Sequence, residues 1–432
     1  MNSKTLALLE RSLHRVLTLL VAALLIFPLG PATLPPSDTI ERIRAYTRAY
    51  EFDYEAWTFN AFRVKVTQNL LDTERYLDLD AQRQVVLDYL ALVEDIQRTE
   101  DEIATLYADP NLPDPDAATA EARARLDALA VRRADLGPLT ESILQAMVAT
   151  VAADFGLTLG GQPVPPVLYH STPLPWALIV SPRDRIEQIR NISLQTETTL
   201  EQHIELEDAV AAGLDYSTLV VPVGGIGTYP TMVIQTTNLN FLVEVVAHEW
   251  IHNYLTLRPL GFLYDATPEL RTMNETTANI AGKEIGAELI RRYFPEFAPP
   301  PPAPPAEPAP EPENTAPPPP TEPPPFDFRA EMHETRLTVD GLLAQGKIEE
   351  AEAYMEARRQ FFWDNGYRIR KLNQAYFAFY GAYADVPGGA AGEDPVGAAV
   401  RDLRAGSADL EAFIDSIAWL TSFEALLETL AE

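Results

Sequence analysis

One helical segment, residues 241–257, constrains this chain more than any other part of the sequence. It reads FLVEVVAHEWIHNYLTL and is largely apolar, with two histidines and two glutamates among its few polar residues. A helix that is apolar all round is buried rather than laid on the surface. The pattern therefore predicts a buried helix, with Asn238 or Asn240 as the residue that caps its start.

The polar residues of this helix have the spacing of a metal site. On an α-helix His248 and His252 lie one turn apart on the same face, so both imidazoles can reach one ion. Glu249 completes the pattern H-E-x-x-H, in which two histidines bind zinc and the glutamate acts as general base. The chain contains no cysteine, so any metal must be held by histidines and carboxylates. We expect one zinc ion per chain; the alternative is a pair of buried histidines that hold no metal.

A zinc ion at a catalytic site needs a third protein ligand. Downstream, ELRTMNETTANIAGKEIGAELIRRYF is predicted to be a second helix, with Asn274 and Glu275 in its first turn. HEWIH followed by NETTA resembles the gluzincin metallopeptidases, whose second zinc helix begins Asn-Glu-x-x-Ala/Ser and supplies a glutamate ligand. The resemblance implies that His248, His252 and Glu275 bind zinc. It also implies Glu249 as the base and an edge strand, here TYPTMVIQTT, along the substrate cleft.

The chain departs from the gluzincin pattern in two places. Twenty-two residues separate His252 from Glu275, a longer interval than usual, so the intervening segment is expected to bulge. One turn after the glutamate, where the family often has an aspartate that orients a histidine ligand, this chain has Asn279. An amide accepts the imidazole N–H without the charge that raises the basicity of the ligand. This substitution predicts a more weakly held metal or a slower enzyme.

The part of the chain after Pro163 also resembles the bacterial predicted aminopeptidases, a gluzincin group with a C-terminal helical segment. The resemblance implies an additional hydrogen-bond donor for the oxyanion of the reaction. The candidates of the usual donor types are Tyr264, Tyr376, Tyr380 and His203. An aminopeptidase also needs a carboxylate that holds the α-amine of its substrate, and Glu244 and Glu205 are considered for this role.

The fold class follows from the period of the apolar residues. From about residue 37 to 157 they recur at intervals of three and four, which predicts helices. Prolines clustered at 110–115 interrupt this stretch, so we expect two long antiparallel, coiled-coil-like helices joined there. After Pro163 short β-branched runs predict strands, with LQTETTLEQHIELEDAV as an intervening helix. The runs are PPVLYHS, WALIVSP, STLVVPVGG and TYPTMVIQTT. The prediction is an α+β, mostly helical fold with a small sheet that leads into the buried helix.

The N-terminus has the features of a membrane-targeting segment. Basic residues at positions 4, 11 and 15 precede an apolar run from Val16 to Phe27, which small and apolar residues extend to Leu34. This length suits a membrane anchor, and Gly30 with Ala32 also offers a site for signal cleavage. Either alternative places the rest of the chain outside the cytoplasm.

Three regions are expected. They are an anchor or signal segment at 1–36, a helical region at 37–158, and a catalytic domain at 159–432 that contains a proline-rich insertion at 298–325. The insertion is predicted to be an extended polyproline-II spacer without a fixed fold. The formal net charge of −30 excludes nucleic acid and anionic lipid head groups as partners of the folded body. The sequence leaves the oligomeric state open.

Together these features predict a membrane-tethered, extracytoplasmic zinc-dependent peptidase that acts on a peptide or protein substrate, in the manner of an aminopeptidase. The alternative is a catalytically silent scaffold or binding protein that keeps the metal helices and contacts a partner through its helical region. Glu249 favours the enzyme, because a structural metal site needs only the ligands. His14, His170 and His333 are expected at the surface or bonded to neighbours, and GGIG is expected to be a turn.

Overall fold

The computed structural model describes residues 38–108, 112–299, 326–381 and 395–431, together with residues 15 and 18. The chain divides into two compact units, Met1–Arg48 and Ala49–Glu432. In the first unit helix α2 (Thr39–Thr47) begins after Asp38, whose side chain accepts a hydrogen bond from the backbone N–H of Glu41. Almost all of the predicted anchor or signal segment and of the predicted proline-rich insertion lies outside the described residues.

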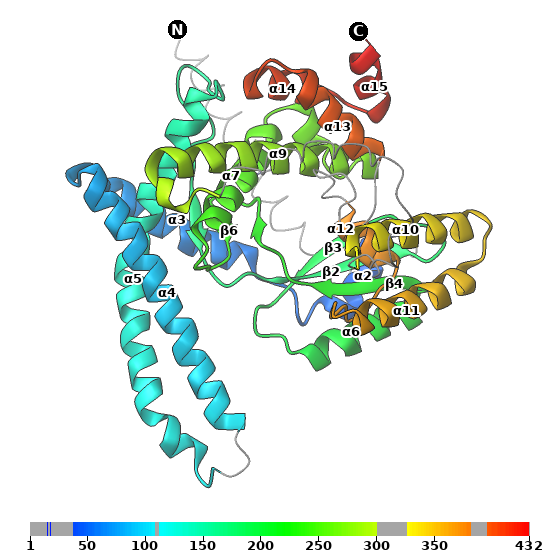
Figure 1. Cartoon of the computed structure of the whole chain (residues 1–432), viewed down its shortest axis with the longest axis horizontal. Helices are drawn as coiled ribbons and strands as arrows, with labels where there is room; N and C mark the ends of the chain where they lie inside the picture. The colour runs from blue at the N-terminus through cyan, green and yellow to red at the C-terminus, as the bar shows by residue number, and fades with distance from the viewer. Residues whose placement is uncertain are drawn as a thin grey trace, which may run out of the picture. The chain divides into compact units, whose positions relative to one another are not determined.

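The second unit is mostly helical and contains two small sheets, as Figure 1 shows. Its α-helices are α3 (Tyr54–Leu71), α4 (Leu79–Ala108), α5 (Pro115–Asp154), α6 (Leu200–Leu214), α7 (Leu239–Thr256), α8 (Pro259–Phe262), α9 (Pro268–Tyr293), α10 (Phe328–Ala344), α11 (Ile348–Asp364), α12 (Gln374–Tyr380), α13 (Pro395–Gly406), α14 (Leu410–Ile417) and α15 (Phe423–Ala431). Its 3-10 helices are η2 (Thr73–Tyr76) and η3 (Pro295–Phe297). Its strands are β1 (Tyr169–Ser171), β2 (Trp176–Pro182), β3 (Arg190–Leu194), β4 (Tyr216–Val221), β5 (Gly225–Ile226) and β6 (Thr231–Val233). The predicted α+β, mostly helical fold is confirmed.

Helices α4 and α5 form the predicted long hairpin, drawn in cyan in Figure 1. The second half of α5 contributes Ile143, Met147 and Val151 to the same apolar core as α7 and α9. This core therefore extends across residue 158, where a domain boundary was expected. In the described part of the chain α5 is the one helix long and apolar enough for a membrane span, and 56% of that apolar window is buried within the protein. The core helix of a soluble protein has the same property.

The strands form two three-stranded sheets. In the first, β2 lies between β3 and β4 and is antiparallel to both. In the second, β6 lies between β1, to which it is parallel, and β5, to which it is antiparallel. The expectation that TYPTMVIQTT forms an edge strand is wrong, because its strand, β6, has neighbours on both sides. The edges of this sheet are β1 and β5, and β5 lies in the GGIG segment that was expected to be a turn.

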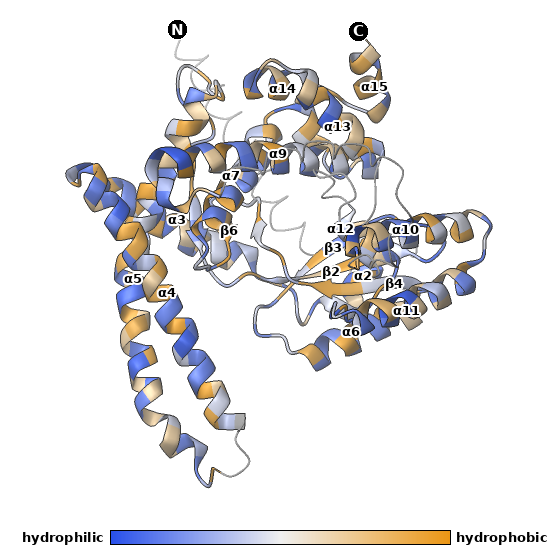
Figure 2. Cartoon of the chain, in the orientation of Figure 1, coloured by the Kyte–Doolittle hydropathy of each residue, from blue (hydrophilic) through white to orange (hydrophobic). Residues whose placement is uncertain are grey.

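Apolar side chains cover one face of the sheet β3-β2-β4, and Figure 2 shows β2 and β4 as hydrophobic strands. The residues packed together there are Ala177 and Ile179 of β2, Leu219 and Val221 of β4, and Ala375 and Phe379 of α12. Helices α10, α11 and α12 share a second apolar cluster that includes Met355, Phe362 and Phe377. These contacts fix α12 against the sheet, which matters for the cleft described below.

Helices α7 and α9 pack closely against each other because α9 carries glycine at two contact positions. A Cβ atom at Gly282 would lie 3.0 Å from the carbonyl oxygen of Glu244 and 3.0 Å from the Cα of His248. A Cβ atom at Gly286 would lie 3.2 Å from the Cα of Glu244. Larger residues at these positions would separate the two helices. The glycines therefore set the distance between the two predicted zinc helices.

Candidate metal centre

Helix α7 carries the HEWIH motif in the core. It begins after Asn238, whose side-chain oxygen accepts a hydrogen bond from the backbone N–H of Phe241 at 3.1 Å. This capping bond identifies Asn238, rather than Asn240, as the cap. His248 and Glu249 are both 7% exposed, so the predicted burial of this helix is confirmed.

Helix α9 begins earlier than its sequence suggested. Thr267 caps it by accepting a hydrogen bond from the backbone N–H of Leu270, and Pro268 occupies its first position, which proline suits. Asn274 and Glu275 consequently lie in the second turn and not in the first. In the interval between His252 and Glu275, α7 continues to Thr256, α8 follows at Pro259–Phe262, and α9 begins at Pro268.

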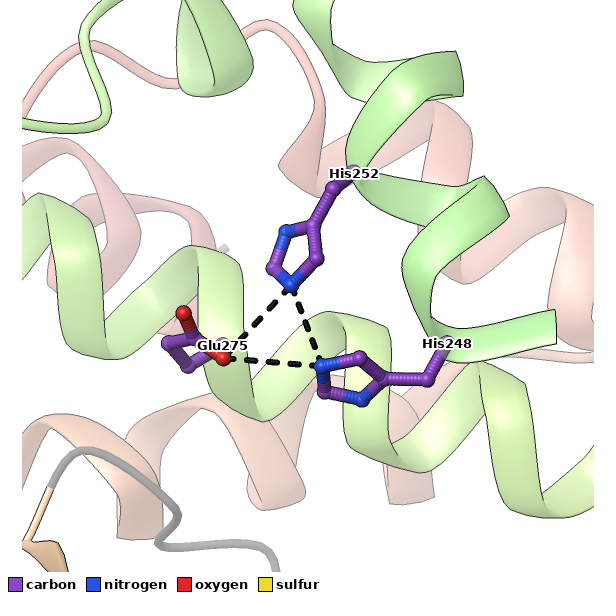
Figure 3. A group of neighbouring side chains, drawn as sticks. All are labelled: His248, His252 and Glu275. Carbon is purple, nitrogen blue, oxygen red and sulfur yellow. Dashed lines mark hydrogen bonds and ion pairs between the residues drawn. The ribbon is translucent and has the colours of Figure 1, made fainter. Parts of the chain in front are cut away.

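Three side chains from α7 and α9 converge on one point, as Figure 3 shows. The Nε2 atoms of His248 and His252 lie 3.1 Å apart, and the Oε2 atom of Glu275 lies 3.6 Å from the first and 3.5 Å from the second. Glu275 Oε2 is buried and accepts no hydrogen bond from the described residues. In a tetrahedral site with bonds of about 2.0–2.1 Å, ligand atoms lie about 3.3 Å apart. The three residues therefore fit around a metal ion.

Two neighbours orient these side chains. Asn274 Oδ1 accepts a hydrogen bond from Nδ1 of His252 at 2.6 Å, and its amide nitrogen donates to the carbonyl of Leu260 at 3.2 Å. The bond at Nδ1 leaves Nε2 of the neutral ring to point at the ion position. The hydroxyl of Tyr264 donates to Oε1 of Glu275, which leaves Oε2 for the ion. The contact to His252 thus comes from Asn274, while Asn279, which was expected to orient a histidine ligand, is half-buried on α9 and has contacts of its own.

The charges of the cluster favour a cation at its centre. Burial disfavours the charged form of His252, yet the Glu275 carboxylate raises the pKa of this imidazole to about 9. Burial likewise disfavours the charged form of Glu275, but His252 and His248 hold its pKa well below the ordinary value. A carboxylate that stays ionised beside two imidazoles stabilises positive charge between them.

Strand β5 covers Glu249. A Cβ atom at Gly225 would lie 2.5 Å from Oε1 of Glu249, and one at Gly227 would lie 3.2 Å from the Cβ of His252. Glycine is therefore required at the first position if the carboxylate keeps its place. Burial raises the pKa of Glu249, an effect that the two histidines oppose. A buried carboxylate with a raised pKa is suited to accept and release a proton.

Asn253, the residue that follows the HEWIH motif, holds strand β5 in place. The side-chain amide of Asn253 donates to the carbonyl of Thr228 and to Oγ1 of Thr231, both at 3.1 Å. These residues belong to the turn between β5 and β6 and to β6 itself. The second sheet is thus tied to α7 one residue after His252.

A cleft of about 590 Å³ opens over the cluster. Its floor includes His248, Glu249, His252 and Glu275, and residues 225–228 form one wall. The rest of the lining includes Tyr54 of α3, residues of β2 and β3, residues in and after α8, the start of α9, and Phe379 of α12. The cluster is therefore open to a molecule of peptide size.

One of the four candidate oxyanion donors, Tyr264, lines this cleft. The rings of Tyr376 and Tyr380 are tilted against each other, with centroids 4.5 Å apart, and pack against the apolar clusters around α12. His203 is buried on α6, where it contacts Thr198 Oγ1 at 2.8 Å and lies edge-on to Trp176. Packing in the core thus places these three side chains outside the cleft, so their expected role as donors is not retained.

The cleft also contains charged residues that were not expected from the sequence. Glu205 is exposed on α6 and Glu244 lies where α7 meets α9, so neither candidate for the substrate amine lines the cleft. Asp265 does line it, as do Arg190 and Arg271. Helical spacing could have identified Arg271, because it lies one turn before Glu275 on the same face of α9.

Comparisons with protein-family models, with curated proteins and with solved structures found no match for this chain. The resemblance to gluzincins is carried by the residues of HEWIH and NETTA.

Proposed function

We propose that this chain is a zinc-dependent peptidase of gluzincin type, tethered to a membrane by its N-terminal segment, with its body outside the cytoplasm. The observation that carries the proposal is the convergence of His248, His252 and Glu275 beneath a cleft, with Glu249 beside them. Two histidines and a carboxylate are a known ligand set of catalytic zinc. The buried glutamate next to the ligands supports catalysis rather than a purely structural metal.

Each residue has a role in this proposal. A zinc ion held by the three ligands would polarise a peptide carbonyl and lower the pKa of a water molecule. Glu249 takes a proton from the attacking water and delivers it to the leaving amine, for which its raised pKa is suited. Asn274 and Tyr264 hold His252 and Glu275 in position.

Tyr264 is also the remaining candidate for the oxyanion donor. Its phenol lies edge-on to the ring of His252, with the centroids 6.0 Å apart, and it bonds to Glu275. To act as a donor it would exchange this bond for one to the substrate. Aminopeptidase action remains a prediction, and Asp265 is the exposed carboxylate of the cleft that could hold a substrate α-amine.

The first test uses the full chain, purified in detergent without a histidine tag or chelator. We expect about one zinc per chain by elemental analysis, and hydrolysis of members of a peptide library. Glu249→Gln should keep the zinc and reduce hydrolysis by at least a hundredfold, because the ligands stay while the base is removed. His252→Ala should lose both.

The outcomes separate the alternatives. Undiminished hydrolysis by Glu249→Gln would contradict the proposed mechanism. Stoichiometric zinc with no hydrolysis of any peptide would favour the scaffold alternative, in which the α4–α5 hairpin contacts a partner. A chain that takes up no zinc, even when zinc is supplied, would leave His248 and His252 as core residues.

A further inference from the structure

Arg271 is a buried cation in the wall of the cleft. It precedes Glu275 by four residues on α9, so the two side chains project from the same face of the helix. Its side chain lines the cleft together with Glu275. Only 8% of its surface is exposed. Arg271 is therefore close to the candidate metal site but makes none of the contacts described above that position the candidate ligands.

The chain provides this guanidinium with few partners. Nη2 donates to the carbonyl of Ala378 at 3.5 Å, a long hydrogen bond, and Nε has no hydrogen-bond partner among the described residues. No carboxylate of the described residues forms an ion pair with it. Burying a charge without a counter-ion costs several kcal/mol in free energy of folding. A guanidinium that is buried without a counter-ion indicates that a ligand, rather than a residue of the chain, supplies the negative charge.

A second buried cation, Lys65, shows how this protein neutralises a buried charge within the fold. Lys65 is 1% exposed, and its ammonium lies 2.5 Å from the carboxylate of Glu141. The chain has 63 acidic residues against 33 lysines and arginines, so carboxylates are abundant. The lack of one beside Arg271 is therefore not explained by a shortage of acids.

The cleft contains another guanidinium. Arg190 lies on the edge strand β3 and lines the cleft. Its Nη1 donates to the carbonyl of Ile189, and its Nε has no hydrogen-bond partner among the described residues. Two arginines in the lining of one cleft attract an anionic ligand, although the molecule has a net charge of −30.

We propose that Arg271 binds a carboxylate of the peptide that enters the cleft, with Arg190 adding to the attraction. A guanidinium recognises a carboxylate through two parallel hydrogen bonds, so a ligand carboxylate would supply the counter-ion that the described residues do not. The carboxylate is either the C-terminus of a short peptide or the side chain of an aspartate or glutamate. The inference rests on the proposed function in one respect, that the ligand is a peptide.

The test measures binding rather than turnover. The full chain with the Glu249→Gln substitution, kept free of metal, is titrated with three peptides by calorimetry. The peptides are tri-alanine with a free C-terminus, tri-alanine amide, and Ala-Glu-Ala amide. We expect at least one of the two carboxylate-bearing peptides to bind about tenfold to a hundredfold more tightly than tri-alanine amide. Which of them binds identifies the source of the carboxylate.

Adding Arg271→Gln should abolish this preference. The matched control is Arg258→Gln, because Arg258 contacts the ring and the carbonyl of Tyr254 and lies outside the cleft. The control should keep the preference in full. Equal binding of all three peptides to the parent protein, or a preference that survives Arg271→Gln, would overturn the proposal. If Arg271 acted only on the oxyanion of the reaction, the preference for a carboxylate would survive Arg271→Gln.

A stability measurement tests whether Arg271 is instead a structural residue. Arg271→Met should leave the melting temperature of the ligand-free protein unchanged or higher, because it removes a buried charge that lacks a counter-ion. A large decrease would show that Arg271 supports the fold, and would contradict the proposal. The carboxylate preference is measured without zinc and without hydrolysis. The preference can therefore be absent while the proposed peptidase function holds, and it can be present while that function fails.

Discussion

Asn274 connects the candidate metal ligands to the segment between the two metal helices. One end of its amide accepts the hydrogen bond of His252, and the other donates to the carbonyl of Leu260 in α8. It is 1% exposed, so neither bond competes with water. A buried amide satisfied at both ends fixes the tautomer and the orientation of the imidazole.

This arrangement predicts the effect of removing the amide. Asn274→Ala should weaken zinc binding by about tenfold to a hundredfold, because His252 loses the group that orients it. The measurement is zinc affinity by competition with a chelator of known affinity. Asn279→Ala serves as the comparison, since Asn279 occupies the position expected to orient a ligand. A loss in Asn279→Ala without one in Asn274→Ala would assign the role to Asn279 instead.

Gly225 allows a separate prediction at the residue scale. A Cβ atom there would lie 2.5–2.8 Å from the side chain of Glu249, which is the movable end of a flexible residue. Gly225→Ala should therefore displace the carboxylate and leave the fold and the zinc content unchanged. We expect hydrolysis to fall by at least tenfold, measured on the peptide that the wild-type protein cleaves best. Loss of zinc together with activity would show that the strand, and not the carboxylate, had moved.

At the scale of elements, the distance between α7 and α9 decides whether the ligands can meet. His248 and Glu275 come from different helices, and Gly282 packs against the backbone of His248 itself. A side chain at this position would act on the ligand directly.

Gly282→Ala should consequently lower both the melting temperature and the zinc affinity, because its Cβ would lie 3.0 Å from backbone atoms of α7. The matched control is Gly341→Ala in α10, where a Cβ meets nothing within 4 Å. Replacing glycine by alanine in an open helix interior stabilises a protein by roughly 0.5–1 kcal/mol. The two substitutions should therefore change thermal stability in opposite directions, and a rise in both would contradict the close packing described here.

The elements also show what the sequence could predict. The helices α4, α5, α7 and α9 and the strand β2 follow from local periodicity, and the ligands follow from spacing along two helices. The strand β3 was missed because RNISL is short and polar, and the edge strand β5 was missed because the glycine-rich GGIG segment does not resemble a strand. The cleft was beyond prediction, since its walls meet only through long-range packing.

At the scale of the whole molecule, a buried polar network joins α3, α5 and β1. The carboxylate of Glu141 accepts hydrogen bonds from Lys65, from the backbone N–H of Ser171 and from Gln68, and contacts Nδ1 of His170 at 2.9 Å. Burial disfavours the charge on Glu141, but Lys65 and His170 lower its pKa to about 2. His170 is thus bonded to a neighbour, as the sequence led us to expect.

The network predicts how stability depends on acid. The pKa of Glu141 is lower in the folded than in the unfolded chain, so its contribution is complete above about pH 4.5 and is lost as the pH falls towards 2. Glu141→Gln leaves Lys65 buried without a counter-ion and should cost roughly 3–5 kcal/mol at neutral pH. The free energy of unfolding of the two proteins, measured in urea, should converge below pH 4.5. A difference that stays constant down to pH 2 would contradict this account.

The candidate metal ligands and the cleft above them differ in how far apart their parts lie along the chain. His248, His252 and Glu275 belong to one run of three consecutive helices, whereas the cleft also needs Tyr54 and Phe379. Contacts between residues close in sequence form early in folding, and distant ones later. We therefore expect a growing or refolding chain to gain its metal-binding residues before it has a place for a substrate. For the proposed peptidase, this order would let the metal bind before the chain could cleave other proteins.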